Sequence, residues 1–96
     1  MATIHITVIL KSKEEETEKV KSTLENLVKN ATSEPGCLQY KLHQEIQDKS
    51  VFVLHETWEN QELFDIHNAQ QYVKDFFAIA PTLLRDKPEV IFTNLL

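Results

Sequence analysis

Glu56 is the residue that most strongly suggests chemistry. It lies in a run of alternating residues, 52–58, where side chains two positions apart point to the same side of a β-strand. Its neighbours on that side are Phe52, Leu54 and Trp58. A carboxylate in such an apolar layer must accept hydrogen bonds or take up a proton. Glu56 is therefore a candidate acid or base.

Tyr40 and His67 are the two residues that we expect to meet Glu56. A hairpin turn over residues 46–50 places Tyr40 opposite Glu56 on the preceding strand, and His67 lies on the helix that follows, which must cover the same face. Tyrosine, carboxylate and imidazole are the groups that transfer protons near neutral pH. The alternative is a purely structural hydrogen bond between Glu56 and His67 that ties helix to sheet.

Hydrophobic periodicity predicts the elements that must position these side chains. Apolar and polar residues alternate, as in strands, over residues 3–10, 37–45, 51–58 and 89–96. Helical spacing covers residues 14–32 and about 60–80, the second helix broken near residues 68–71. Ser12, in a capping box with Glu15, and Asn60 are the predicted N-caps. Pro81 and Pro88 are expected to bracket a loop.

The resulting order, β-α-β-β-α-β, is typical of a ferredoxin-like α+β fold. It predicts a four-stranded antiparallel sheet with both helices on one face. Right-handed crossovers place the first and third strands side by side at the centre. A chain of 96 residues is long enough for one core, so we expect a single domain over residues 1–96.

The other face of this sheet is predicted to be bare and mixed in character. Its expected residues are Ile9, Cys37, Val51 and Val53 among His5, Gln39, Lys41 and His55. Two such sheets packed face to face would cover each other, so we expect a homodimer, with a half-solvated monomeric sheet as the alternative. The histidine spacing fits no metal-ligand motif, and no metal is predicted.

Composition and charge exclude several classes of protein. The net charge of −5, without clustered lysines, disfavours binding to nucleic acid. A single glycine excludes a glycine-rich phosphate loop. No apolar run approaches the ~20 residues of a membrane span, and the N-terminus does not resemble a signal peptide. One cysteine forms no internal disulfide, which favours a reducing, cytoplasmic setting.

Three fragments of the chain resemble the antibiotic biosynthesis monooxygenase (ABM) domain. They are EPGCLQYKL at residues 34–42, FVLHETWE at 52–59 and FDIH at 64–67. The family pattern is a Pro-Gly or Glu-Gly, a Leu-x-Tyr-x-Leu strand, a Glu-x-Trp that ends the third strand, and a histidine on the following helix. The fragments occur in order at the right spacing, and the match spans essentially the whole chain.

The resemblance implies a dimeric α+β barrel and a pocket between sheet and helices. Family members oxidise quinols or polycyclic aromatic phenols with molecular oxygen and need no metal or prosthetic group, so we expect a monooxygenase without a cofactor. His67 is expected to accept the substrate's phenolic proton, Glu56 to orient His67, and Tyr40 to bond the substrate oxygen. The expected substrate contacts are Trp58, Leu42, Leu54, Phe64 and Tyr72.

Two departures from the family pattern narrow this expectation. Many members carry a second histidine where this chain has Tyr72, which disfavours a mechanism with two helix histidines. Residues 74–80 lack the histidine that binds iron in haem-degrading relatives, so haem is not expected. Two alternatives stay open. One is an isomerase acting on a small carbonyl or phosphorylated compound, and the other is a non-catalytic dimer that binds a small ligand, or none.

Overall fold

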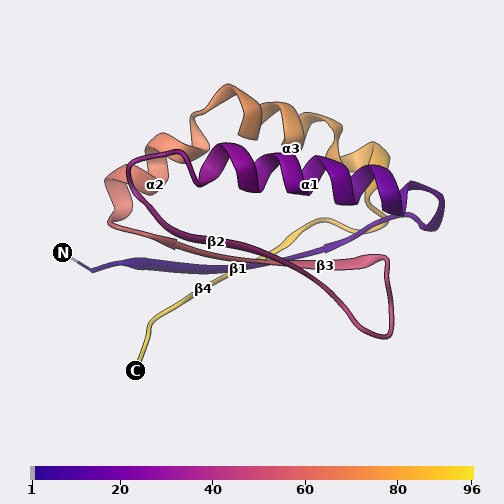
Figure 1. Ribbon diagram of the computed structural model, residues 1–96, viewed down its shortest axis with the longest axis horizontal. Helices are drawn as coiled ribbons and strands as arrows, with labels where there is room; N and C mark the ends of the chain where they lie inside the picture. Colours follow the sequence, from indigo (N-terminus) through magenta and orange to yellow (C-terminus); the bar gives the residue numbers. More distant parts are fainter. Residues whose placement is uncertain (1) are drawn as a thin grey trace.

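The computed structural model describes residues 2–96 and shows a layer of helices on one face of a sheet (Figure 1). A short 3₁₀ turn at Glu14–Glu16 precedes the first α-helix. In chain order the elements are β1 (Ile4–Lys11), α1 (Thr17–Ala31), β2 (Cys37–Gln44), β3 (Val51–Trp58), α2 (Gln61–Asn68), α3 (Gln71–Leu83) and β4 (Glu89–Thr93). This is the predicted ferredoxin-like α+β fold.

The sheet has the strand order β2-β3-β1-β4, and every neighbouring pair is antiparallel. β1 and β3 are therefore the central strands, as the handedness of the crossovers predicts. The two edge strands are β2 and β4. All three α-helices lie on the same side, above the sheet in Figure 1, and leave the opposite face uncovered.

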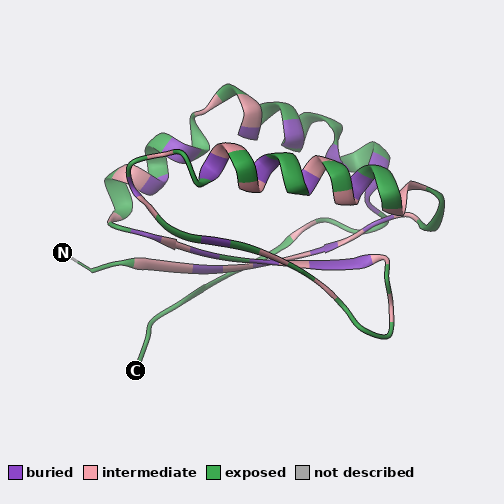
Figure 2. Ribbon diagram, viewed as in Figure 1, coloured by how far each residue is buried: buried purple, intermediate pink, exposed green. Residues whose placement is uncertain are grey.

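One apolar core fills the space between the helices and the sheet (Figure 2). α1 contributes side chains spaced three and four residues apart, which lie on one face of a helix. α3 does the same from the other side of the layer. The buried residues of these two helices are Val20, Leu24, Leu27 and Ala31, and Val73, Phe76, Ala80 and Leu83. The helices thus cover the face of the sheet from which Glu56 projects.

The register of β2 against β3 confirms the pairing on which the candidate site depends. Tyr40 lies opposite Glu56, and Leu42 lies opposite Leu54. A bulge between Cys37 and Gln39 shifts the start of β2. A bulge inserts one extra residue into a strand. The residues before it therefore point to the faces opposite to those that simple alternation predicts.

The bulge makes two sequence predictions wrong. Leu38, expected on the apolar face with Tyr40, is 57% exposed. Cys37, expected on the open face, packs against the core instead. Val51 was also assigned to the open face and is buried, 7% exposed, where the β2–β3 hairpin folds back.

The helix boundaries agree with the sequence in part. Asn60 caps α2, its side-chain oxygen accepting from the amide of Leu63 at 2.9 Å, and the predicted break falls between α2 and α3. Ser12 does not cap a helix. It is fully buried, and its hydroxyl lies 2.9 Å from the Thr17 hydroxyl.

The C-terminal segment differs from the prediction at two points. Pro81 is inside α3 rather than in a loop, because the helix continues to Leu83 and buries that side chain in the core. A proline near a helix end removes only one hydrogen bond. The last strand stops at Thr93, three residues before the end of the chain. Across residues 2–96, no helix combines the length and apolar character needed to cross a membrane.

Candidate active site

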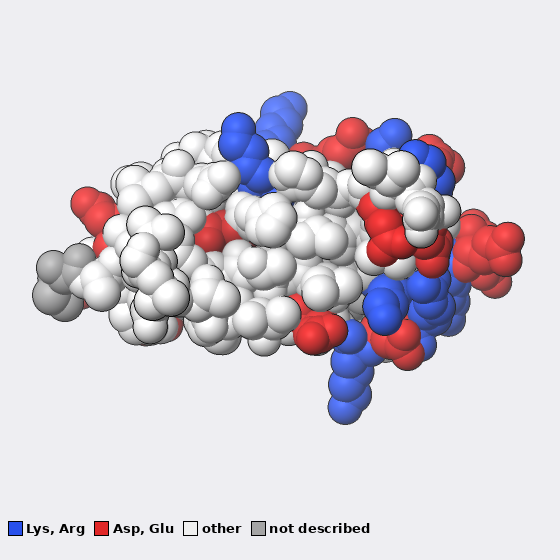
Figure 3. Space-filling model, turned by 90° about the horizontal axis from the view of Figure 1, so that it is seen from below, with Lys and Arg blue, Asp and Glu red and all other residues white. Residues whose placement is uncertain are grey.

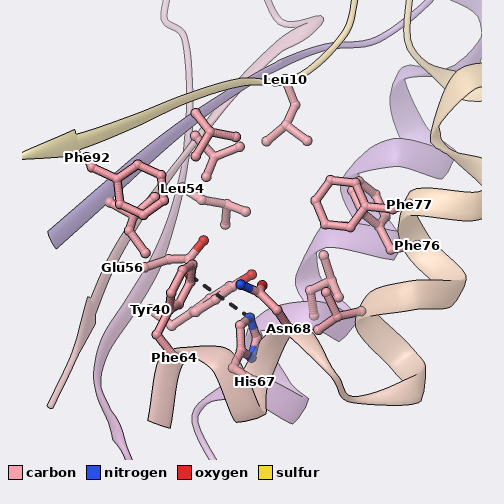
Figure 4. Close-up of a pocket in the computed structure, with 15 residues that line it drawn as sticks. Leu10, Tyr40, Leu54, Glu56, Phe64, His67, Asn68, Phe76, Phe77 and Phe92 are labelled. Carbon is pink, nitrogen blue, oxygen red and sulfur yellow. Dashed lines mark ion pairs between the residues drawn. The ribbon is translucent and has the colours of Figure 1, made fainter. Parts of the chain in front are cut away.

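A cavity of about 250 Å³ lies between the sheet and the helices (Figure 4). Aliphatic and aromatic side chains form most of its wall. The polar residues that line it are Tyr40, Glu56, His67 and Asn68. The cavity therefore offers an apolar space with a few polar groups at one side, which is the usual composition of a small-molecule site.

Glu56 projects from β3 into this space and is only 7% exposed. Its Oε1 accepts a hydrogen bond of 2.9 Å from Nε1 of Trp58. Burial raises the pKa of the Glu56 carboxyl, and the bond from Trp58 and the nearby His67 oppose that rise only in part. The alternation of β3 thus places a carboxyl group in an apolar layer, as the sequence predicts.

His67 lies on α2, 3% exposed, with its two ring nitrogens in different surroundings. Nδ1 is 2.7 Å from Oε2 of Glu34, a hydrogen-bond distance. Nε2 is 4.0 Å from Oε1 of Glu56, the ion pair that Figure 4 marks with a dashed line. The carboxylate that orients the imidazole is therefore Glu34 and not Glu56, because 4.0 Å is too long for a hydrogen bond.

Glu34 comes from the loop between α1 and β2 and binds two partners. Its Oε2 accepts from His67 Nδ1 and from the hydroxyl of Tyr72 on α3. Gly36 lets this loop approach α2 closely, since a Cβ at that position would collide with Leu63. The bond to Glu34, together with burial, raises the pKa of Tyr72. Tyr72 is therefore a neutral donor that helps to fix the Glu34 carboxylate.

The geometry at His67 selects one tautomer of the neutral imidazole. A carboxylate at Nδ1 requires the proton on Nδ1, which leaves the lone pair on Nε2. Nε2 faces the side of the cavity where Glu56 lies. This is the arrangement of a general base that a buried carboxylate orients from behind.

Two aromatic residues surround the imidazole. Trp58 has no exposed surface and lies against His67, with ring centroids 4.3 Å apart and an angle of 30° between the planes. Tyr40 meets His67 edge-on, with centroids 5.8 Å apart. Burial and the neighbouring Glu56 raise the pKa of Tyr40, so its hydroxyl stays protonated and can donate a hydrogen bond.

The structure places the expected substrate contacts in two groups. Leu54 and Phe64 line the cavity. Trp58, Leu42 and Tyr72 do not: Trp58 and Tyr72 bind the carboxylates that surround His67, and Leu42 packs against the core.

Sequence reasoning did not predict several residues of the site. Glu34 is in a loop, where no periodicity reports its position, although it begins the EPG fragment of the family resemblance. Asn68 ends α2 beside His67, and Phe77, Val90 and Phe92 bring α3 and β4 to the cavity. The apolar alternation of residues 89–93 was the available signal for β4.

Among residues 2–96, no group of three or more His, Cys, Asp or Glu side chains is arranged to hold a metal ion. His43 and His55 lie edge to face on the open side of the sheet, with ring centroids 5.1 Å apart. His55 directly precedes Glu56 in β3, but alternation puts both histidines on the opposite face of the sheet.

The raised pKa of Glu56 has a consequence for stability. The folded protein holds this proton more tightly than the unfolded chain, so its stability falls as the pH rises from the ordinary value of 4.5 through the raised pKa. Glu56→Gln keeps an acceptor for Trp58 and removes this titration. We expect it to raise the free energy of unfolding at neutral pH relative to the wild type, because the variant no longer loses stability as the carboxyl ionises.

Urea unfolding of both proteins across pH measures this effect. The two should be equally stable in acid, and the advantage of Glu56→Gln should grow with pH. A wild-type protein that gains stability relative to the variant as the pH rises would show that the ionised carboxylate is favoured by its surroundings instead.

Comparisons with known proteins identify the family of this chain and find the same fold in solved structures. Residues 3–79 match the family model described as Antibiotic biosynthesis monooxygenase. The crystal structure of PA3566 from Pseudomonas aeruginosa superposes with a TM-score of 0.94 at 23% identity, covering 100% of this chain and 96% of that one. A structure described as an antibiotic biosynthesis monooxygenase gives 0.90 at 24% identity, covering 97% and 98%. At these identities the likeness concerns the fold.

Two curated relatives are longer proteins, and this chain matches only part of each. An uncharacterised protein of Synechocystis is 26% identical over 81 residues, and human N-terminal EF-hand calcium-binding protein 1 is 32% identical over 63 residues. These matches take in 84% and 66% of this chain, which spans 55% and 18% of the respective relatives. The match to the family model covers most of the chain and includes Glu34, Glu56 and His67, and the chain belongs to the antibiotic biosynthesis monooxygenase family.

Proposed function

We propose that this protein oxidises an electron-rich phenol or quinol with molecular oxygen, and that His67 takes the phenolic proton. The observation that carries the proposal is the pair of contacts on the imidazole. Nδ1 is bound to the partly buried Glu34 carboxylate, while Nε2 is directed to an apolar cavity. Membership of a monooxygenase family supports the same class of reaction.

The first step is proton transfer from the substrate hydroxyl to Nε2 of His67. The resulting imidazolium is stabilised by the Glu34 carboxylate at 2.7 Å. Tyr40, whose hydroxyl stays protonated, is placed on the same side of the cavity to donate a hydrogen bond to the phenolate oxygen. Removing the proton makes the ring a stronger electron donor, which is what a reaction with oxygen requires.

The second step forms a carbon–oxygen bond. The phenolate gives one electron to oxygen, and the two radicals combine at the ring carbon opposite the hydroxyl. The peroxide anion then takes the proton back from His67 to give a hydroperoxide, which returns His67 to its neutral form. Loss of water then breaks the O–O bond and removes the hydrogen of that carbon, which leaves a para-quinone. One phenol and one O₂ give one quinone and one H₂O, and the substrate supplies all four electrons.

The size of the cavity limits the aromatic part of the substrate. A cavity of roughly 150 Å³ is enough to hold benzene, and this one is about 250 Å³. The space supports a head of one or two rings better than the larger polycyclic phenols that the family resemblance also includes. The cavity counts against a dimer that binds no ligand, whereas a non-catalytic dimer that binds a small ligand would also contain one.

Oxygen uptake with a panel of one- and two-ring phenols and quinols tests the proposal. We expect uptake to depend on enzyme, and heavy-isotope oxygen gas to label one oxygen atom of the product. The control is Glu25→Gln, which changes an exposed residue of α1 away from both the cavity and the open face of the sheet and should act like the wild type. Product formation without oxygen uptake would instead favour an isomerase.

We also propose that two copies pair through the open face of the sheet. Ile9 and Val53 lie opposite each other there and are half-buried, and Ile91 on β4 is 38% exposed. Figure 3 shows this face from below, with its charged side chains gathered mainly toward one end. Covering an apolar patch of this kind would stabilise a homodimer.

Light scattering measures the predicted association. The wild type should have twice the mass of one chain, and Val53→Glu, which puts a charge at the middle of the patch, should shift the mass to that of a monomer. A wild type that is monomeric at micromolar concentration would contradict the proposed pairing.

A further inference from the structure

The cavity is polar at one end and apolar along the rest of its length. Tyr40, Glu56 and His67 gather at one side in Figure 4, while Leu10 and Phe77 lie away from them. A ligand that places a hydroxyl at His67 must therefore direct its remaining atoms toward the apolar end. Those atoms gain most if they are apolar themselves.

The apolar end opens between α3 and β4. The residues that line the cavity from β1 are buried, with Ile6 at 3% and Val8 at 6% exposed. In contrast, Phe77 on α3 is 50% exposed, and Val90, which pairs with Val8 from β4, is 45% exposed. The mouth of the cavity is thus rimmed by large apolar side chains in contact with solvent.

A second hollow of about 310 Å³ begins at the same mouth. Phe77 lines both spaces, so it is the shared wall between them. Ala80, Pro81 and Leu84 continue the wall of the second hollow along the end of α3, and Pro88 faces them from the segment before β4. Charged residues 85–87 lie at its rim. We call this second hollow the α3 groove.

We propose that the α3 groove binds an unbranched apolar chain carried by the phenolic substrate. The ring lies in the cavity with its hydroxyl at His67, and the chain passes Phe77 and lies against Ala80, Pro81 and Leu84. Because Phe77 lines both spaces, the cavity and the groove are adjacent, and one ligand that extends past Phe77 would occupy both. The cavity alone is smaller than most ligand pockets, which are roughly 300–1,000 Å³, and the groove supplies the missing volume.

Binding of meta-alkylphenols, from methyl to heptyl, tests the chain site without any turnover and keeps the ring carbon opposite the hydroxyl free. We expect the dissociation constant measured by calorimetry to fall with each added methylene by up to about fourfold, which corresponds to about 0.8 kcal/mol for each methylene buried. The decrease should stop once the chain fills the groove. Pro81→Gln, at an exposed residue that lines only the α3 groove, should flatten this dependence on chain length and leave the affinity for the methyl compound nearly unchanged.

The matched control is Ile79→Gln. Ile79 is an exposed apolar residue of the same helix, 42% exposed, and it lines neither space. This variant should retain the full dependence on chain length. An affinity that does not change with chain length, or an equal loss in both variants, would overturn the proposal. So would a change of oligomeric state in Pro81→Gln, because the groove would then be a contact between copies.

This inference rests on the proposed function only for the identity of the head group, and the two can fail separately. If alkylphenols bind with the expected dependence on chain length but no phenol is oxidised, the groove stands and the oxidation fails. If short phenols are oxidised and chain length has no effect on binding, the oxidation stands and the groove fails.

Discussion

Replacing His67 with alanine is expected to lower kcat/KM for oxygen-dependent phenol oxidation by about 10²–10⁴-fold, the usual contribution of a general base. The variant keeps the cavity and its apolar wall but loses the group that takes the phenolic proton. Its effect should therefore be largest at a pH below the pKa of the phenol and should shrink as the free phenolate becomes abundant. Steady-state oxygen uptake across pH measures both features.

His67→Gln is the control for the possibility that His67→Ala is inactive only because it does not fold. Glutamine fills part of the same space, and its amide can still donate a hydrogen bond to Glu34, but it cannot accept a proton near neutral pH. Both variants should therefore lose activity to a similar extent, although Glu34 keeps a hydrogen-bond donor only in His67→Gln. Activity in folded His67→Gln that equals the wild type would remove the proposed role.

Replacing Glu34 with glutamine is expected to lower kcat by about 10²-fold and to change KM little. The amide is close to the carboxylate in size, so the loop and the contact with Tyr72 are preserved. It lacks the charge that stabilises the imidazolium, and it can donate a hydrogen bond to Nδ1, which would hold the wrong tautomer. An effect confined to kcat is the signature of an interaction that strengthens in the transition state.

Tyr72→Phe is the graded control for Glu34. It removes one hydrogen bond to the same oxygen and leaves the charge in place. Loss of a single hydrogen bond changes a free energy by about 0.5–1.5 kcal/mol, so activity should fall by roughly three- to tenfold. A larger loss in Tyr72→Phe than in Glu34→Gln would mean that the tyrosine, not the carboxylate, controls the imidazole.

The sequence was sufficient for the fold because local pattern and topology agree. Alternation in β1 and β3 and helical spacing in α1 identify the elements, and the handedness of crossovers then orders the strands. The same alternation placed Glu56 opposite Tyr40, since the two strands share a short hairpin. The position of a residue is predicted well where the two-residue alternation holds in its own strand and in the strand paired with it.

The parts that sequence reasoning missed depend on contacts without a period. Glu34 reaches His67 from a loop, across a separation of 33 residues, and only the close approach of Gly36 to Leu63 brings them together. The bulge at the start of β2 moved Cys37 and Leu38 to unexpected faces. Sequence reasoning therefore brought Tyr40, Glu56 and His67 to one cavity but did not find Glu34, the carboxylate within hydrogen-bond distance of His67.

Direct titration with para-nitrophenol in the absence of oxygen gives the most decisive test of the central claim, because the phenol and its anion differ in colour. At a pH below the pKa of the free compound, the wild type is predicted to bind it as the anion, with the absorbance of the phenolate, while His67→Gln binds the neutral phenol. A wild type that binds only the neutral form, or shows the same spectrum as His67→Gln, would contradict proton transfer to His67.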